Sequence, residues 1–199
     1  MAAPTLAGVE QFLAIVIAYL LGSVSFGVLV ARTRGIDIHA VGSGNTGTSN
    51  VMRVLGKKLG AVVLVGDAGK GMLAAAVGVW MVEPAFGYVT LFAAVIGHAF
   101  PVFHRFRGGK SVATTLGGFV LLAPAVGITL TVIWAVVLIV WKTASVGSII
   151  VMILAVPLLW LSGRTGSDLL WSGAIVVFVL IRHSGNISRL IQGSERKVA

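Results

Sequence analysis

The chain has 199 residues, of which 57% are hydrophobic and only 11% are charged. A soluble domain of this size needs many more charged residues to cover its surface, so the composition excludes an ordinary soluble protein. The formal net charge is +9, but the basic residues lie between hydrophobic runs, which argues against nucleic acid as a partner. The chain has no cysteine, which excludes disulfides and a cysteine acyl intermediate.

Long apolar runs follow one another and predict an all-α membrane protein, a bundle of seven transmembrane helices. The expected spans lie at about 11–31, 60–82, 86–103, 111–123, 125–141, 145–163 and 168–182. The segment 111–140 holds two spans only if both are short or tilted. We expect no separate soluble domain, so residues 1–199 are predicted to form a single integral membrane domain.

The basic residues indicate the orientation of the bundle. With these spans, every Lys and Arg except Lys70 and Arg164 falls on one side of the membrane. Because basic loops stay in the cytoplasm, the sequence predicts an N-terminus outside and a cytoplasmic C-terminus.

A glycine-rich loop follows the first span. The stretch AVGSGNTGTSN contains Gly42, Gly44 and Gly47 at the spacing of a dinucleotide fingerprint. That fingerprint requires a βαβ unit, whereas a membrane span follows here, so the dinucleotide interpretation is rejected. Glycines also let backbone N–H groups converge on another anion. The alternative is a flexible loop whose basic residues touch lipid headgroups.

The end of the same loop is predicted to form a helix N-terminus that faces an anion. Ser49 or Asn50 is expected to cap a helix that starts near Val51, with Arg53 in its first turn. The free N–H groups and dipole of such a helix favour phosphate or carboxylate.

A second motif, GDAGKG, lies inside the second span. Asp67 and Lys70 are three residues apart and share a helix face, so they can pair. Charged groups inside a span either lock the bundle as an internal ion pair or face a ligand. The sequence leaves both roles open.

Two further polar segments fall on the same side. Gly108 and Gly109 lead into a helix with Lys110 at its start, which predicts a second anion-binding site at a helix N-terminus. His98 is expected to pack against a neighbouring helix. No pair of histidines has a metal-binding spacing, so no metal site is expected.

The C-terminal segment supplies His183, and Arg182, Asn186 and Arg189 would share a face of one helix; the alternative is an ordinary basic tail. Together these segments predict an anion pocket on the cytoplasmic side. Its cations would be Arg53, Lys70, Lys110 and either Arg182 or Arg189.

The four motifs resemble those of one family, the bacterial acyl-phosphate:glycerol-3-phosphate acyltransferases of the PlsY type. Its patterns GSGNxGATNVxRxLGKK, DxxKG, GHxxPVFxxFKGGKGVAT and RHxxNIxRLxxGxE correspond here to GSGNTGTSNVMRVLGKK, DAGKG, GHAFPVFHRFRGGKSVAT and RHSGNISRLIQGSE. The match runs in order from about Tyr19 to Glu195. The chain departs at Ser25, where the family often has proline, and at Ser111, where it has glycine.

The resemblance implies transfer of a fatty acyl group from acyl phosphate to the 1-hydroxyl of sn-glycerol 3-phosphate, with lysophosphatidic acid and phosphate as products. It implies no cofactor, a bacterial inner membrane location with the site facing the cytoplasm, and an upstream acyl-phosphate-forming enzyme as metabolic partner. Rival interpretations are a transporter or channel for a phosphate-bearing solute and a non-catalytic lipid-binding scaffold.

The resemblance also assigns site residues. It implies that Arg53, Lys110 and His183 are catalytic, although the proton acceptor is either His183 or a substrate phosphate. The substrate-binding residues would be Ser43, Gly44, Asn45, Asn50, Arg53, Lys70, Gly108, Gly109, Lys110, His183 and Asn186. Asp67 is expected to shape the site.

Overall fold

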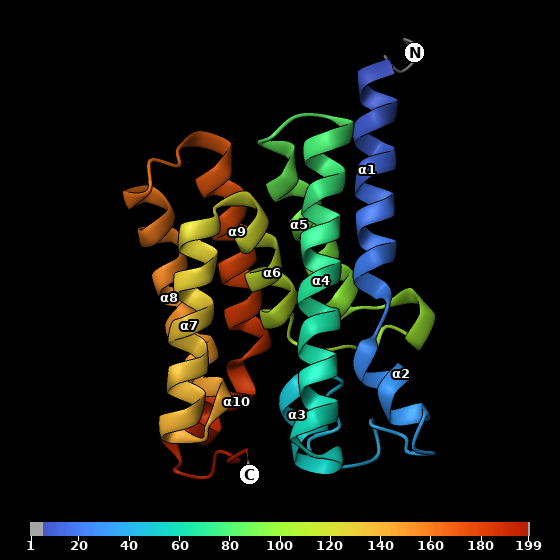
Figure 1. Ribbon diagram of the computed structural model, residues 1–199, viewed down its shortest axis with the longest axis vertical. Helices are drawn as coiled ribbons and strands as arrows, with labels where there is room; N and C mark the ends of the chain where they lie inside the picture. The colour runs from blue at the N-terminus through green and yellow to red at the C-terminus, as the bar shows by residue number, and fades with distance from the viewer. Residues whose placement is uncertain (1–5, 199) are drawn as a thin grey trace.

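The computed structural model describes residues 6–198 as a bundle of helices joined by short loops (Figure 1). The elements are α1 (Leu6–Ser23), α2 (Phe26–Arg32), α3 (Thr48–Leu55), α4 (Lys57–Met81), α5 (Phe86–Ala99), the 3-10 turn η1 (Val102–His104), α6 (Val112–Leu122), α7 (Pro124–Trp141), α8 (Ala144–Leu161), α9 (Gly166–Arg182) and α10 (Ser184–Ile191). The predicted all-α class is therefore confirmed. α1 begins at one end of the bundle, and the segment after α10 ends at the other.

Five segments of the described chain are long and apolar enough to cross a membrane. They are Leu6–Arg32, Lys57–Met81, Phe86–His104, Pro124–Trp141 and Ala144–Leu161. α9 and α10 add a sixth if they count as one span broken by a bend of 54°. α6 has 11 residues, about 16 Å of helix, roughly half of the hydrocarbon thickness. The length criterion alone therefore identifies five or six spans, and the predicted seven, which count the short α6, are not confirmed.

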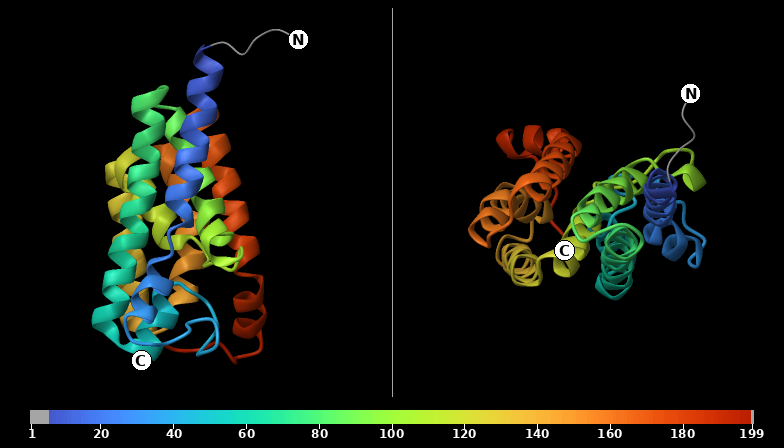
Figure 2. Two further views of the ribbon diagram at one scale, coloured as in Figure 1. Left: turned by 90° about the vertical axis from the view of Figure 1, so that its right-hand side faces the viewer. Right: turned by 90° about the horizontal axis from the view of Figure 1, so that it is seen from above.

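The helices pack in two groups with α6 between them. α4 packs against α1, α5 and α6, whereas α7 packs against α6 and α8. α9 contacts α8 on one side and α5 on the other, which joins the two groups (Figure 2). The short α6 begins deep in the bundle, so the loop that precedes it reaches the interior.

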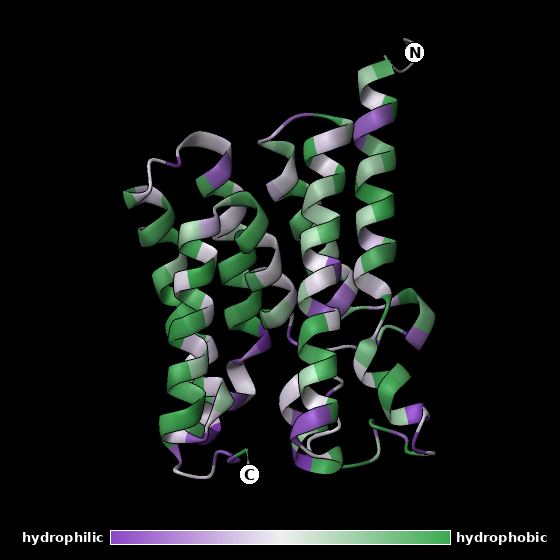
Figure 3. Cartoon of the chain, viewed as in Figure 1, coloured by the Kyte–Doolittle hydropathy of each residue, from purple (hydrophilic) through white to green (hydrophobic). Residues whose placement is uncertain are grey.

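Apolar side chains cover the outside of this bundle. Val65, Ile139 and Leu161 are more than two-thirds exposed, which suits contact with lipid tails rather than water. Hydrophilic residues gather at the end that carries α2, α3, α10 and the last described segment (Figure 3). This end holds the glycine-rich loop and the C-terminal segment, whereas Asp67 and Lys70 lie buried in the interior of α4.

The first predicted span is interrupted rather than continuous. α1 ends at Ser23 and α2 begins at Phe26, and Ser25 caps α2 by accepting a hydrogen bond from the Val28 amide at 3.5 Å. The break frees the carbonyl of Val24, which accepts a hydrogen bond from the Lys70 ammonium at 2.6 Å. The predicted first span at about 11–31 is thus present within Leu6–Arg32, with a break at residues 24–25 that the sequence analysis did not anticipate.

Glycines allow α4 and α6 to approach closely. A Cβ added at Gly71 would meet the backbone of Thr114, and a Cβ added at Gly117 would meet the backbone of Ala68. Small residues at such crossings are typical of membrane helices, since close backbone packing replaces the hydrophobic effect there.

We predict that Gly71→Ala destabilises the bundle by about 1–3 kcal/mol, because the added methyl overpacks the α4–α6 contact. The matched control is Gly69→Ala in the same helix, where a Cβ meets nothing within 4 Å. Melting temperatures in detergent should fall for the first variant and not for the second. Equal melting temperatures for the two variants would contradict this packing account.

Candidate active site

A cavity opens at the hydrophilic end of the bundle, between α3, α4, α6, α7, α8 and α10. Its empty volume is about 860 Å³, counting the part open to solvent. The predicted residues that line it are Ser43, Asn45, Asn50, Arg53, Lys110, His183 and Asn186. The predicted residues Gly44, Lys70, Gly108 and Gly109 are not part of its lining.

Asn50 organises the glycine-rich loop. Its Oδ1 accepts a hydrogen bond from the Ser43 amide at 2.8 Å, while its Nδ2 donates to the carbonyls of Val41 (3.1 Å) and Asn45 (2.9 Å). Gly42 is in the left-handed region with φ 62°, and a Cβ there would meet Asn50 Oδ1. Although Asn50 borders the cavity, its amide is thus engaged in shaping the loop.

The helix after the loop starts earlier than predicted. α3 begins at Thr48, and no side chain caps it because its N-cap residue is Gly47. The expected start near Val51 was wrong, and Arg53 lies in the last turn of α3 rather than in its first. The first turn of α3 nevertheless lines the cavity. Asn50 N and Val51 N donate to the Gly47 carbonyl. The N–H groups of Thr48 and Ser49 are therefore the ones left free there among the described residues.

The glycines before α6 make room for backbone packing. Gly109 donates its N–H to the carbonyl of His98 at 3.1 Å, and its own carbonyl accepts a hydrogen bond from Arg182 Nη2 at 3.1 Å. A Cβ on Gly109 would meet the His98 ring. This N–H is therefore not available to an anion, and the loop instead positions Lys110.

Ser111 occupies a position where the resemblance led us to expect glycine. Its φ is 65°, in the left-handed region that disfavours residues with a Cβ. The Ser111 hydroxyl donates to the carbonyl of Val95 at 2.8 Å, which offsets part of this cost. α6 begins directly after it, and Val112 and Ala113 line the cavity, so a second helix N-terminus faces the same space, as predicted.

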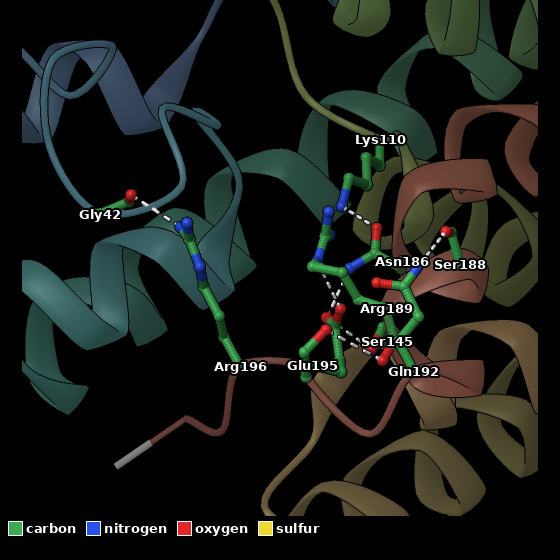
Figure 4. A network of polar contacts seen from close by, with 10 residues as sticks. Gly42, Lys110, Ser145, Asn186, Ser188, Arg189, Gln192, Glu195 and Arg196 are labelled. Carbon is green, nitrogen blue, oxygen red and sulfur yellow. Dashed lines mark hydrogen bonds and ion pairs between the residues drawn. The ribbon is translucent and has the colours of Figure 1, made fainter.

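A carboxylate network joins α8, α10 and the C-terminal segment (Figure 4). Glu195 accepts hydrogen bonds from Ser145 (3.0 Å) and Asn186 (2.6 Å) at Oε1 and from Arg189 Nε (2.8 Å) at Oε2. Burial alone would raise the pKa of Glu195, but these hydrogen bonds hold it below the ordinary value. Glu195 is thus a carboxylate that orients Asn186 and Arg189.

Lys110 completes this network, because its ammonium donates a hydrogen bond to Asn186 Oδ1. Burial lowers the pKa of Lys110 to about 8; Glu195 opposes this shift, and Arg189, Arg182 and Arg53 add to it. The charged form of Lys110 is therefore destabilised by burial and by the neighbouring positive charges.

The C-terminal segment covers one side of the cavity. Arg196 Nη1 donates to the carbonyl of Gly42 at 2.7 Å, and Arg53 Nε donates to the carbonyl of Lys197 at 3.2 Å. Glu195, Arg196 and Val198 all line the cavity. None of these residues was assigned to the site from the sequence; the acidic Glu195 within a basic tail was the signal that could have indicated them.

Arg182, Asn186 and Arg189 were predicted to share one helix. In the structure this helix is bent, so Arg182 lies on a different helix from the other two residues. α9 ends at Arg182, α10 begins at Ser184, and the two are bent by 54°. The Arg182 guanidinium lies 5.2 Å from the centroid of the Phe100 ring. His183 at the bend lines the cavity together with Asn186 and Arg189.

Asp67, Lys70 and His98 form a buried cluster beside the cavity. The Lys70 ammonium lies 2.9 Å from Asp67 Oδ1, and His98 Nδ1 lies 3.6 Å from the same oxygen. The predicted pairing of Asp67 with Lys70 is confirmed, and His98 faces the neighbouring α4 as expected. Asp67 and His98 border the cavity, whereas Lys70 bonds to Val24 across the break in the first span.

The remaining wall of the cavity is apolar. It includes Leu64 of α4, Leu116 of α6 and Trp134 of α7. The Trp134 indole N–H donates to the Ser148 hydroxyl at 3.2 Å, which satisfies its polar atom inside the bundle. The cavity therefore offers cations and helix N-termini together with apolar walls, and it suits an anion that carries an apolar group.

A family model described as glycerol-3-phosphate acyltransferase matches residues 12–193. The chain belongs to this family. Its members include a glycerol-3-phosphate acyltransferase of Rubrobacter xylanophilus, 40% identical over 94% of each chain. A member from Aquifex aeolicus is 38% identical over 92% of this chain and 96% of its own.

Solved structures support the same assignment. The crystal structure of PlsY (YgiH), an integral membrane glycerol 3-phosphate acyltransferase, in its glycerol 3-phosphate form has a TM-score of 0.89 and 36% identity over 95% of this chain and 96% of the other. The lysophosphatidic acid form of that protein has a TM-score of 0.86 and the same identity over 94% of each chain. This likeness confirms the all-helical integral membrane fold of this acyltransferase family member.

We predict that the affinity for sulfate, an anion of constant charge, falls roughly tenfold or more from about pH 7 to about pH 9. Lys110 is a cation below its pKa of about 8 and neutral above it. Isothermal titration calorimetry measures this change. In Lys110→Arg the guanidinium stays charged, so its affinity should change little over this range; an equally steep loss in both proteins would contradict the role of Lys110.

Proposed function

We propose that this family member transfers a fatty acyl group from acyl phosphate to the 1-hydroxyl of sn-glycerol 3-phosphate. The observation that carries the proposal is the convergence of Arg53, Lys110 and Arg189 with the first turns of α3 and α6 on one cavity. Both substrates carry a phosphate, which such groups bind. The apolar walls from α4, α6 and α7 suit the acyl chain.

The proposed reaction needs no covalent enzyme intermediate. The glycerol oxygen attacks the acyl carbonyl carbon, the bond from that carbon to the phosphate oxygen breaks, and phosphate leaves with the bonding electrons. Acyl phosphate is a mixed anhydride with a good leaving group, so orientation and charge stabilisation are the tasks left to the protein. Arg53 and Lys110 are assigned the phosphates.

We assign the hydroxyl proton to His183. Its Nδ1 lies 2.8 Å from the carbonyl oxygen of Val179, and because a carbonyl can only accept, Nδ1 carries the hydrogen. Nε2 is then the unprotonated ring nitrogen and can accept a proton. Asn186 follows His183 at the start of α10 and holds Lys110 through its Oδ1.

The membrane arrangement of the proposal follows the charge distribution. All Lys and Arg residues except Lys70 and Arg164 would lie in the cytoplasm. The chain would cross the membrane seven times, with its N-terminus outside the cell and its C-terminus in the cytoplasm. Residues 1–5 and 199, which include both ends of the chain, lie outside the described residues. The enzyme would act as a single domain in the bacterial inner membrane and receive acyl phosphate from a separate enzyme upstream.

We predict that Arg53→Ala and Lys110→Ala each lower acyltransferase activity by roughly a hundredfold or more, because each removes a cation that holds phosphate. Activity is measured as lysophosphatidic acid formed from acyl phosphate and labelled glycerol 3-phosphate. The control Lys58→Ala removes an exposed cation at the same end and should keep full activity. Full activity in Arg53→Ala or Lys110→Ala at unchanged melting temperature would refute the assignment.

Replacement of the proposed base should act on a different kinetic constant. His183→Gln should lower kcat by roughly a hundredfold and leave the KM for glycerol 3-phosphate within about threefold. Steady-state kinetics of the purified variant measure both constants. An unchanged kcat would assign the proton to a substrate phosphate instead.

A further inference from the structure

A second cavity lies apart from the proposed active site, between α2, the loop that follows it and the η1 turn. Its empty volume is about 1090 Å³, counting the part open to solvent. No residue of its lining is shared with the first cavity. The lining includes Arg32, Asp37, His39, Phe103, Arg105 and Arg107.

The position of this cavity corresponds to the headgroup level of a bilayer. Two of the candidate spans, Leu6–Arg32 and Phe86–His104, end at its wall. Figures 1 and 3 show that α2 runs to the hydrophilic end of the bundle, whereas η1 and the loop after α5 lie beside α2 and nearer the middle of the bundle. A lipid in this cavity could therefore place its phosphate toward the end of α2 and its first acyl carbons beside η1.

The cavity is positively charged, and its cations lack partners. No hydrogen bond or ion pair within residues 6–198 engages the guanidinium groups of Arg32, Arg105 and Arg107. The single acidic residue of the lining, Asp37, accepts a hydrogen bond from the His39 amide at 3.0 Å. Three arginines thus line this cavity without a partner. Its one carboxylate, Asp37, is already engaged within the loop.

Aromatic side chains flank these arginines. Phe103 and Phe106 are each 59% exposed and lie on the loop that also carries Arg105 and Arg107. Arg105 and Phe106 are consecutive left-handed residues with φ 52° and 58°, a conformation that costs free energy without glycine. Hydrogen bonds from Phe106 N to Pro101 O and from Arg107 N to His104 O, both 3.0 Å, hold this loop.

We infer that this cavity binds the phosphate headgroup of an anionic phospholipid. The three arginines would hold the phosphate, and the two exposed phenylalanines would contact the first carbons of the acyl chains, which removes their apolar surface from water. A soluble anion would gain nothing from the exposed phenylalanines, so a lipid fits the whole surface better. The site does not depend on the proposed acyltransferase activity.

Native mass spectrometry of the detergent-solubilised protein, titrated with phosphatidylglycerol or phosphatidylcholine, tests the inference. The wild type should bind phosphatidylglycerol in clear preference. The variant Arg32→Gln/Arg105→Gln/Arg107→Gln should lose roughly a hundredfold in affinity for it, from about 1 kcal/mol for each arginine. The charge-matched control Lys57→Gln/Lys58→Gln/Lys142→Gln, at exposed positions of the same end, should keep the preference. If the triple arginine variant does not fold, Arg105→Gln alone should lower the affinity several-fold.

Three results would overturn the inference. Equal binding of the two lipids by the wild type would remove the anionic selectivity, and equal losses in the arginine and lysine variants would show general charge attraction rather than a site. Full competition by glycerophosphoglycerol, which has no acyl chains, would show a site for a soluble anion. Acyltransferase assays in phosphatidylcholine vesicles should give equal rates for wild type and both variants, which separates this site from the proposed active site.

Discussion

Excess positive charge in a partly enclosed cavity is the constraint on which the site depends. Arg53, Lys110, Arg189 and Arg196 line the cavity, and of its two carboxylates Asp67 is paired with Lys70. Glu195 alone cannot balance four cations, and burial among them lowers the pKa of Lys110 to about 8. Bound phosphate removes this imbalance, and the first turns of α3 and α6 add N–H groups that favour the same charge.

Irregular helices surround this cavity, and each irregularity brings a polar group into an apolar bundle. The short α6 lets the loop before it carry Lys110 inward, and the bend between α9 and α10 places His183 where its Nδ1 meets the Val179 carbonyl. The break after α1 gives Lys70 a carbonyl partner at Val24. Irregular backbone at membrane depth is tolerated where protein groups satisfy it, and here these groups frame the site.

The sequence predicted the helical membrane class because a helix that crosses the hydrocarbon core needs a long run of apolar residues. Its motifs predicted that Arg53, Lys110, His183 and Asn186 meet, and the structure places all four on one cavity; their catalytic and binding roles stay predictions. The break at Ser25 escaped prediction because the carbonyl that it frees, at Val24, is satisfied by Lys70 from another helix. The start of α3 and the bend at His183 involve local contacts that the motifs do not reveal, those of Asn50 within its loop and of His183 with the Val179 carbonyl. Asn50, which was predicted to bind substrate, holds the glycine-rich loop together. Glu195 was missed because no motif in the sequence shows that the chain after α10 folds back onto Asn186, Arg189 and Ser145 of α8.

The central claim is that the charged cavity carries out acyl transfer rather than passage of a phosphate-bearing solute. The most direct measurement supplies purified wild-type protein, reconstituted in sealed vesicles, with acyl phosphate and labelled glycerol 3-phosphate on the outside. We expect labelled lysophosphatidic acid in the membrane and one phosphate released for each molecule formed. Labelled glycerol 3-phosphate that accumulates unmodified inside the vesicles, with no lysophosphatidic acid, would contradict it.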